Sequence, residues 1–225
     1  MIIINGINSE IVKKILKKFL KKHKIIGIYN SNYIGFRHKK LKLLKKNEKN
    51  LKKIENLIKK EKKIIFINFA AKRDQGLILK FNKKNFLNII HDNIIDSLKI
   101  LQILLPHMIK NNFGRIIFTS SSTAENGSIG NLGYSASKSS LKGISGTIAK
   151  EYRDFNITSN ILSLGYFNSR MWTSLPEKNK KDLILNTLKK KLCNENAIFE
   201  IIETIIKHNS INMSTIFIDG GNLKR

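Results

Sequence analysis

Residues 114–151 read GRIIFTSSSTAENGSIGNLGYSASKSSLKGISGTIAKE, and three successive patterns in this stretch decide the fold. The apolar run at 115–119 predicts a buried strand, and the pattern from about 133 to 152 predicts a helix. Between them lies a loop rich in serine, asparagine and glycine, and loops at the ends of strands commonly carry function. We therefore expect a strand–loop–helix unit with a functional site at the end of its strand.

The same alternation of strand and helix continues along the rest of the chain. Short apolar runs predict further strands at 2–4, 25–29, 41–44, 64–68, 157–163 and 215–218. Apolar positions at helical spacing predict helices at 11–20, 51–58, 86–109, 178–191 and 196–207. This order is typical of a three-layer α/β fold with a doubly wound, mainly parallel sheet. Pro106 and Pro176 are the only prolines and no internal repeat occurs, so we expect a single domain over residues 1–225.

The composition suits a folded protein of a reducing compartment. The 225 residues are 41% hydrophobic and 26% charged, which excludes disordered and fibrous classes. Cys193 is the only cysteine, so neither an intrachain disulfide nor a multi-thiolate metal site can form. The five histidines are scattered without metal-binding spacing, and no apolar run is long enough to span a membrane. We expect a soluble, cytoplasmic protein that holds no metal and has no membrane partner.

The charge is the unusual property of this composition. Lysine and arginine number 42 against 16 acidic residues, which gives a net charge of +26 and an isoelectric point near 10.1. Such a chain attracts nucleic acid non-specifically. Only six of the 42 are arginines, however, whereas specific readers of nucleic acid favour the arginine fork. Lysine, asparagine and isoleucine are abundant together, as in the products of an AT-rich genome, so we expect no specific nucleic-acid partner.

Tyr134 and Lys138 carry the strongest chemical signal. Four residues apart on a helix, they lie on one face, so the ammonium lies near the phenol. A phenol with a pKa of about 10 is a poor acid at neutral pH, and a neighbouring cation lowers that value. Ser121 comes 13 residues before Tyr134, at the carboxyl end of a predicted strand, where it could hydrogen-bond a substrate oxygen. These three residues suit acid–base chemistry, but a Tyr/Lys pair at this spacing is by itself more often a chance surface pair, so its surroundings decide between the two.

These motifs closely resemble those of the short-chain dehydrogenase/reductase family. The resemblance begins with Gly114-Arg115 before the strand, the serine at its end, and the YxxxK pair. It extends in order along nearly the whole chain and implies a Rossmann-like fold. The further matching segments are Asn68-Phe69-Ala70-Ala71, Asn93 in HDNIIDSL, Leu164-Gly165-Tyr166 with Ser169, and Ile218-Asp219-Gly220-Gly221.

The resemblance implies a catalytic tetrad and a site for a nicotinamide dinucleotide. Tyr134 would protonate the carbonyl oxygen, and Lys138 would lower the pKa of Tyr134 and bind the nicotinamide ribose. Ser121 would polarise the carbonyl, and Asn93 would hold a water of the proton relay. The implied cofactor-binding residues are Gly6, Asn8, Ser9, Ile11, Asn30, Asn47, Asn68, Ala70, Tyr134, Lys138, Gly165, Phe167 and Ser169.

The first turn departs from the family pattern TGxxxGxG. Here Asn5-Gly6-Ile7-Asn8-Ser9-Glu10-Ile11-Val12 keeps only the first glycine, although such glycines let a backbone approach a pyrophosphate. Glu10 adds negative charge there, while it also suits the first turn of a helix. A catalytically silent homologue that acts as a basic binding protein is therefore an alternative, and cofactor binding distinguishes it from an enzyme.

The end of the second predicted strand favours NADPH over NADH. An acidic residue at this place binds the ribose diol of NAD, and Tyr29-Asn30-Ser31-Asn32 contains none. Arg37, His38, Lys39 and Lys40 follow within the expected reach of a 2′-phosphate.

Within the family, the chain looks most like β-ketoacyl-acyl-carrier-protein reductases, a likeness that Lys72-Arg73-Asp74 strengthens. This implies reduction of a 3-oxoacyl thioester, with an acidic acyl carrier protein as a partner that suits the basic surface. Asn112 and Phe155 stand where such reductases place carrier-binding arginines. The alternative substrate is another carbonyl, such as a sugar-nucleotide or polyketide intermediate.

Two further expectations concern the substrate wall and the assembly. Met171, Trp172 and Leu175 could line an apolar substrate site. The resemblance also implies a homotetramer or homodimer, formed through the helices that precede and include the YxxxK pair.

Overall fold

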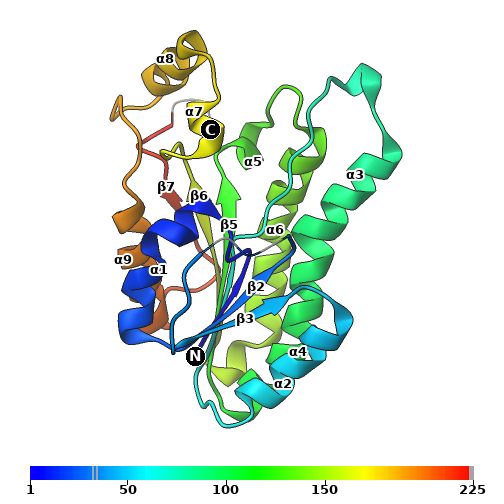
Figure 1. Ribbon diagram of the computed structural model, residues 1–225, viewed down its shortest axis with the longest axis vertical. Coiled ribbons are helices and arrows are strands. Elements are labelled where there is room, and N and C mark those ends of the chain that lie inside the picture. Colours follow the sequence, from blue (N-terminus) through cyan, green and yellow to red (C-terminus); the bar gives the residue numbers. More distant parts are fainter. Residues whose placement is uncertain (32, 34, 223–225) are drawn as a thin grey trace.

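A computed structural model describes residues 1–31, 33 and 35–222, which form a three-layer α/β fold (Figure 1). The central sheet has seven strands in the order β3-β2-β1-β4-β5-β6-β7, and every neighbouring pair is parallel. The strands are β1 (Ile2–Asn5), β2 (Ile25–Tyr29), β3 (Leu41–Lys45), β4 (Ile64–Asn68), β5 (Gly114–Ser121), β6 (Ile157–Leu164) and β7 (Thr215–Ile218). The predicted single-domain, doubly wound sheet is thus observed.

Helices cover both faces of this sheet. On one face, α1 (Glu10–Lys22) and α9 (Glu195–Lys207) bury their apolar sides together. On the other face lie α2 (Glu48–Ile58), α4 (Asp96–Lys110) and α6 (Leu132–Glu151). The shorter elements are η1 (Ile78–Lys80), α3 (Lys83–Ile90), η2 (His91–Ile95), α5 (Thr123–Asn126), η3 (Arg153–Phe155), α7 (Arg170–Thr173) and α8 (Glu177–Leu185).

The isoleucine-rich strands explain why two apolar cores form. Side chains alternate along a strand, so Ile2 and Ile4 join the core under α1 and α9 while Ile3 joins the core under α2, α4 and α6. A parallel sheet that is covered on both faces needs continuous apolar strands, and β1, β4, β5 and β6 are buried at every position.

Two predicted helices differ from the observed ones. The helix expected at 86–109 runs from Lys83 to Lys110, but it is interrupted by the π-helical turn η2. Such turns often occur at functional sites. The helix expected at 178–191 ends at Leu185. Tertiary contacts stop it, because Thr187 bridges to Asn222 and the amide of Leu188 donates to the carbonyl of Gly221 at 2.9 Å.

The strand order changes direction between β1 and β4. From β1 the chain builds β2 and β3 outward on one side, whereas β4 to β7 extend on the other. Ligands of open α/β sheets bind in the crevice at the carboxyl ends of the strands next to this point. Asn5 and Asn68 end β1 and β4 side by side, and Asn5 Nδ2 donates to Asn68 Oδ1 at 2.9 Å.

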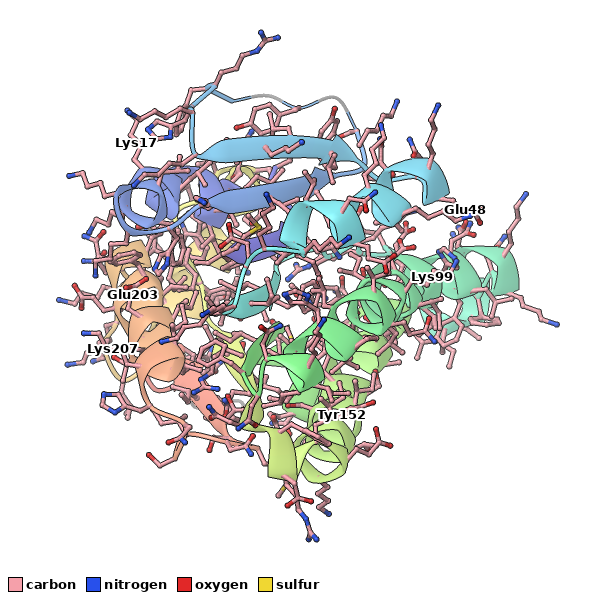
Figure 2. All side chains as sticks on the ribbon, turned by 90° about the horizontal axis from the view of Figure 1, so that it is seen from below. Lys17, Glu48, Lys99, Tyr152, Glu203 and Lys207 are labelled. Atoms are coloured by element: carbon pink, nitrogen blue, oxygen red, sulfur yellow. The ribbon has the colours of Figure 1, made fainter. Side chains whose placement is uncertain are left out.

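The positive charge is distributed over both helical layers. Figure 2 shows side chains with nitrogen tips projecting on several sides of the molecule, and its labelled lysines Lys17, Lys99 and Lys207 belong to α1, α4 and α9. Within the residues that the structure describes, no helix is long and apolar enough to cross a membrane.

Candidate active site

Tyr134 and Lys138 lie on the first turns of α6, beside the carboxyl end of β5. Both side chains are buried, with 6% and 3% of their surface exposed. The Lys138 Nζ donates to the carbonyl of Thr119 at 2.7 Å and lies 5.8 Å from the centre of the Tyr134 ring. The predicted juxtaposition of ammonium and phenol is therefore present in the fold.

The surroundings of Tyr134 favour its ionisation. Burial would raise the pKa of the phenol, but the charges of Lys138 and Arg73 and side-chain hydrogen bonds with Arg73 and Ser121 together outweigh it. The pKa of Tyr134 therefore lies below its usual value. The pKa of Lys138 is also lowered, mainly because the ammonium is buried. The charge of the phenol opposes this shift, and the charge of Arg73 adds to it. The structure thus brings Ser121, Tyr134 and Lys138 together as predicted.

Asn93 lies in the π-helical turn η2 and ties two segments together. Its Oδ1 accepts from the amide of Lys72 at 2.6 Å, and its Nδ2 donates to the Lys72 carbonyl at 2.9 Å and to Ser137 Oγ at 2.8 Å. Ser137 in turn donates to the carbonyl of Tyr134 at 2.8 Å. Asn93 therefore links the segment after β4 to the helix of Tyr134, while its role in holding a water stays a prediction.

A cavity of about 530 Å³ opens beside these residues. Arg73, Ser121 and Ser122 provide polar groups on its lining. Its apolar lining residues are Ile11, Tyr166, Phe167, Trp172, Leu175 and Leu183. The predicted lining by Trp172 and Leu175 is observed, whereas the side chain of Met171 lies outside the described part of the chain. A polar end facing an apolar wall suits a carbonyl compound that carries an apolar chain.

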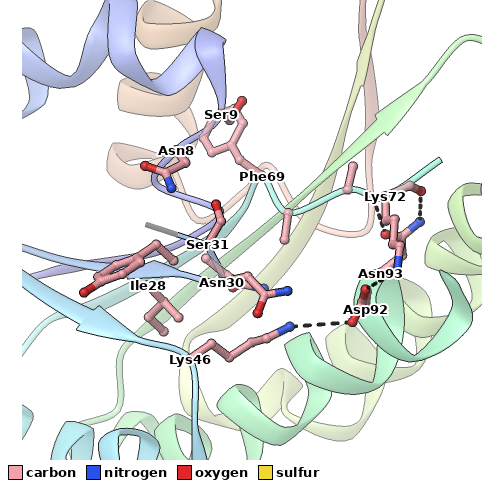
Figure 3. A pocket seen from close by; sticks show the side chains of 15 residues that line it. Asn8, Ser9, Ile28, Asn30, Ser31, Lys46, Phe69, Lys72, Asp92 and Asn93 are labelled. Atoms are coloured by element: carbon pink, nitrogen blue, oxygen red, sulfur yellow. Dashed lines mark hydrogen bonds and ion pairs between the residues drawn. The ribbon is translucent and has the colours of Figure 1, made fainter. Parts of the chain in front are cut away.

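A second cavity, of about 720 Å³, lies at the carboxyl ends of β1, β2 and β4 (Figure 3). The predicted cofactor residues on its lining are Gly6, Asn8, Ser9, Asn30 and Ala70, together with the predicted catalytic residue Asn93. Four other predicted cofactor residues, Ile11, Gly165, Phe167 and Ser169, line the smaller cavity, and Ser9 lines both. The predicted cofactor residues on these linings are thus divided between two cavities, which meet at Ser9, just before α1.

The residues of the larger cavity fit a dinucleotide. Gly6 has a φ of +85°, and a Cβ there would lie 2.5 Å from the amide nitrogen of Ala70, so this tight turn requires glycine. Ser9 precedes α1 and forms no side-chain hydrogen bond to its first turn among the described residues, which leaves room for an anion at the helix N-terminus. Asn68 Nδ2 is buried and has no partner among the described residues. Each feature is suited to a ligand with phosphate and amide groups.

Asn47 lines neither cavity. It precedes α2, where its side chain accepts from the amide of Asn50 at 2.8 Å and so caps the helix. Its predicted contact with the cofactor stays a prediction.

The prediction that Arg37, His38, Lys39 and Lys40 reach a 2′-phosphate is wrong for the last three of these residues. The carbonyl of Lys40 accepts from the amide of Ile25 at 2.7 Å, and that of His38 accepts from Leu41, so these residues precede β3 at the amino end of the sheet. Five residues of strand, about 16 Å, separate this end from Asn30. The basic side chains on the larger cavity are those of Lys46 and Lys72, among the described residues.

Lys46 follows β3 at the carboxyl edge of the sheet, and its amide donates to the carbonyl of Tyr29 at 2.7 Å. Its ammonium pairs with Asp96. It also pairs with Asp92 at 3.7 Å, as Figure 3 shows. Lys72 pairs with Asp92 from the other side at 3.3 Å. His91, Asp92 and Asp96 also lie close enough to suggest a metal site, but two lysines already balance these carboxylates.

The sequence is similar to those of several known proteins. The sequence model of a family described as short chain dehydrogenase matches residues 4–180. The 3-oxoacyl-[acyl-carrier-protein] reductase FabG of Buchnera aphidicola from Acyrthosiphon pisum is 27% identical, over 97% of this chain and 95% of the relative. The FabG of Thermotoga maritima is 26% identical over 75% of this chain and 70% of the relative.

Solved structures share the fold. The structure described as ElxO with NADP bound has a TM-score of 0.86 at 21% identity, covering 100% of this chain and 98% of that one. A putative betaketoacyl-ACP reductase has a TM-score of 0.80 at 14% identity, with coverage of 100% and 98%.

Proposed function

We propose that this chain, which belongs to the short-chain dehydrogenase family and therefore acts on CH–OH or ketone groups, reduces 3-oxoacyl thioesters to 3-hydroxyacyl thioesters with NADPH. The observation that carries the proposal is the Tyr134 hydroxyl, hydrogen-bonded with Ser121 and Arg73 beside a cavity with an apolar wall. Such a cavity takes a ketone oxygen at one end and an acyl chain along the other.

The chain's own residues supply the proton and the orientation. Ser121 orients the substrate oxygen toward Tyr134, whose O–H donates its proton to that oxygen. Lys138 stabilises the phenolate that remains, and the burial of both side chains strengthens this interaction because little water screens it. A nicotinamide cofactor, when bound, supplies the hydride for the carbonyl carbon.

NADPH is the proposed cofactor because the end of β2 on the larger cavity carries no acidic residue and a lysine follows β3 beside it. Tyr29, Asn30 and Ser31 at the end of β2 offer no carboxylate for a ribose diol. Lys46 lies directly beside them, and although it pairs with Asp92 and Asp96, it is the cation that a 2′-phosphate would attract at this place.

The substrate proposal rests on the apolar wall and on the relatives. Trp172, Leu175 and Leu183 suit an acyl chain, and the two FabG relatives are reductases of 3-oxoacyl groups by name. A net charge of +26 favours an acidic carrier protein as the partner that delivers the chain.

A homotetramer or homodimer is the proposed assembly. Exposed apolar side chains lie on η1 and α3, where Ile78, Leu79 and Leu87 are 69%, 92% and 53% exposed. Isolated monomers rarely expose a patch of this kind. A second copy of the chain, packed along α4 and α6 in the manner of the family, would cover it.

Titration of the purified protein with NADPH and with NADH tests the cofactor proposal. Nicotinamide fluorescence and thermal shift are followed at physiological salt, which screens non-specific attraction to the lysines. We expect saturable binding that prefers NADPH, followed by turnover of an acetoacetyl thioester. A folded sample that binds neither nucleotide would favour the silent homologue, since Glu10 and Val12 replace two glycines of the family turn.

A further inference from the structure

Arg73 lies beside Tyr134 and Ser121, although no pattern in the sequence gives it a catalytic role. Its guanidinium carbon lies 4.3 Å from the centre of the Tyr134 ring, and its side chain hydrogen-bonds with that of Tyr134. The same side chain lines the smaller cavity together with Ser121. One cation thus faces both the tyrosine and the space for the substrate.

Asp74 fastens the neighbouring backbone to the helix of Tyr134. Its Oδ2 accepts from the amide of Gly133 at 2.8 Å and its Oδ1 from the amide of Tyr134 at 3.1 Å. A Cβ at position 133 would lie only 3.2 Å from this carboxylate, so glycine allows the close approach. The amide of Gly76 donates to the carbonyl of Gly130 at 3.1 Å and adds a second tie between the two segments.

The other end of the segment is fixed as well. Asn93 binds both main-chain groups of Lys72, as described above. Arg73 therefore lies between two residues whose backbone is held by hydrogen bonds. The backbone entropy at Arg73 is thus lost on folding and not when its side chain binds Tyr134. When Arg73 contacts Tyr134, only side-chain entropy remains to be lost, and the planar guanidinium limits that loss per hydrogen bond.

We propose that Arg73 is a further catalytic residue: with Lys138, its guanidinium stabilises the negative charge on the Tyr134 oxygen when the proton leaves for the substrate. The step transfers one proton from the phenol to the substrate oxygen, and Arg73 neither gains nor loses one. Its planar fork can lie on the ring and bond the hydroxyl at once, which a lysine cannot do. As a statement about catalysis, the inference rests on the proposed function.

Several charged or titratable groups face this centre. Lys138 lies on α6 itself, Tyr166 follows β6, and Glu10 of α1 lines the cavity that Arg73 also lines. Asp74 is directed at the N-terminus of α6. Burial raises the pKa of Tyr166, and the charge of Arg73 opposes this only in part. The test must therefore separate the ionisation of Tyr134 from that of its neighbours.

Spectrophotometric titration of tyrosinate measures this ionisation without substrate or cofactor. The chain has five tyrosines, so the difference between the full chain and Tyr134→Phe isolates Tyr134, and the same subtraction is repeated in each Arg73 background. We expect Arg73→Met and Arg73→Gln to raise the titration midpoint of Tyr134 by about one pH unit. Arg73→Lys should raise it by less. Two neutral variants are used so that one informative variant remains if the other fails to fold.

Lys142→Met is the matched control. Lys142 is an exposed cation of α6, eight residues from Tyr134, or about 12 Å along the helix. Its loss should leave the midpoint unchanged, since salt screens a charge at that distance.

Two results separate this inference from the proposed function. If the wild type reduces acetoacetyl thioester, kcat/KM should fall about tenfold in Arg73→Met and less than twofold in Lys142→Met. An unchanged Tyr134 midpoint in both folded neutral variants overturns the role of Arg73, whatever the activity. A shifted midpoint in a protein that reduces no ketone supports the Arg73–Tyr134 coupling and counts against the proposed function alone.

Discussion

Replacing Asp74 with alanine removes two hydrogen bonds from the first turn of α6. The amides of Gly133 and Tyr134 lose acceptors at 2.8 and 3.1 Å, and the helix N-terminus loses a carboxylate. Asn131 does not substitute for it, because its side chain donates to Ser128 and to the carbonyl of Ile129 in the preceding loop. The cap is thus supplied by a residue about 60 positions away in the sequence.

The expected cost follows from these contacts. A lost N-cap acceptor costs about 1 kcal/mol, and a lost charge at a helix N-terminus costs about 0.3–1 kcal/mol. We therefore expect Asp74→Ala to lower the free energy of unfolding by roughly 1–2 kcal/mol, or the Tm by roughly 2–8 °C for a chain of this size. Because Tyr134 is in the loosened turn, kcat should fall by more than KM rises.

Urea unfolding and steady-state kinetics of Asp74→Ala, Asp74→Asn and Asp154→Ala measure both effects. Asp154 is exposed and pairs with the equally exposed Arg153 at 3.5 Å, so its loss should cost almost nothing. Asp74→Asn keeps one acceptor and should lie between the wild type and Asp74→Ala. Equal stabilities for Asp74→Ala and Asp154→Ala would refute the capping role.

Three further variants test the charges around the site. Lys138→Met removes a cation that lowers the pKa of Tyr134. The plateau of kcat/KM should therefore fall, and the pH above which kcat/KM declines should rise; an unchanged pH of decline counts against the pairing. Glu10→Gln removes an anion from the first turn of α1, and NADPH should bind roughly two- to fivefold tighter at low salt; unchanged binding there would place the pyrophosphate elsewhere. Lys46→Met should weaken NADPH more than NADH in parallel titrations, whereas equal losses would remove Lys46 from the 2′-phosphate site.

Local patterns predicted most of the sheet because its strands are covered on both faces. Such strands must be continuous apolar runs, and isoleucine-rich runs identify β1, β2 and β4 without any knowledge of their partners. The YxxxK pair was equally visible, because helical spacing alone places Tyr134 and Lys138 on one face.

Features that depend on distant pairing could not be predicted in this way. Lys40 lies at the amino end of the sheet because of the register between β2 and β3, which no local pattern contains. The helix α8 stops at Leu185 because the chain beyond it pairs with residues 220–222.

The roles of Arg73 and Asp74 belong to the same class. Their partners Gly133 and Tyr134 are about 60 residues away, and the sequence showed Lys72-Arg73-Asp74 only as part of a family likeness. One signal was present: both residues follow a predicted strand closely, at the edge of the sheet where Ser121 also lies. That position alone makes a charged residue a candidate for the site.

The most direct test of the account compares the wild type with Tyr134→Phe in the NADPH-dependent reduction of an acetoacetyl thioester, at equal occupancy by NADPH. We expect the variant to bind NADPH within about twofold of the wild type, because only a hydroxyl is lost, and to reduce the thioester at least about 100-fold more slowly. A variant that keeps most of the wild-type rate, or that loses NADPH binding to the same degree as turnover, would contradict the assignment of Tyr134 as the proton donor.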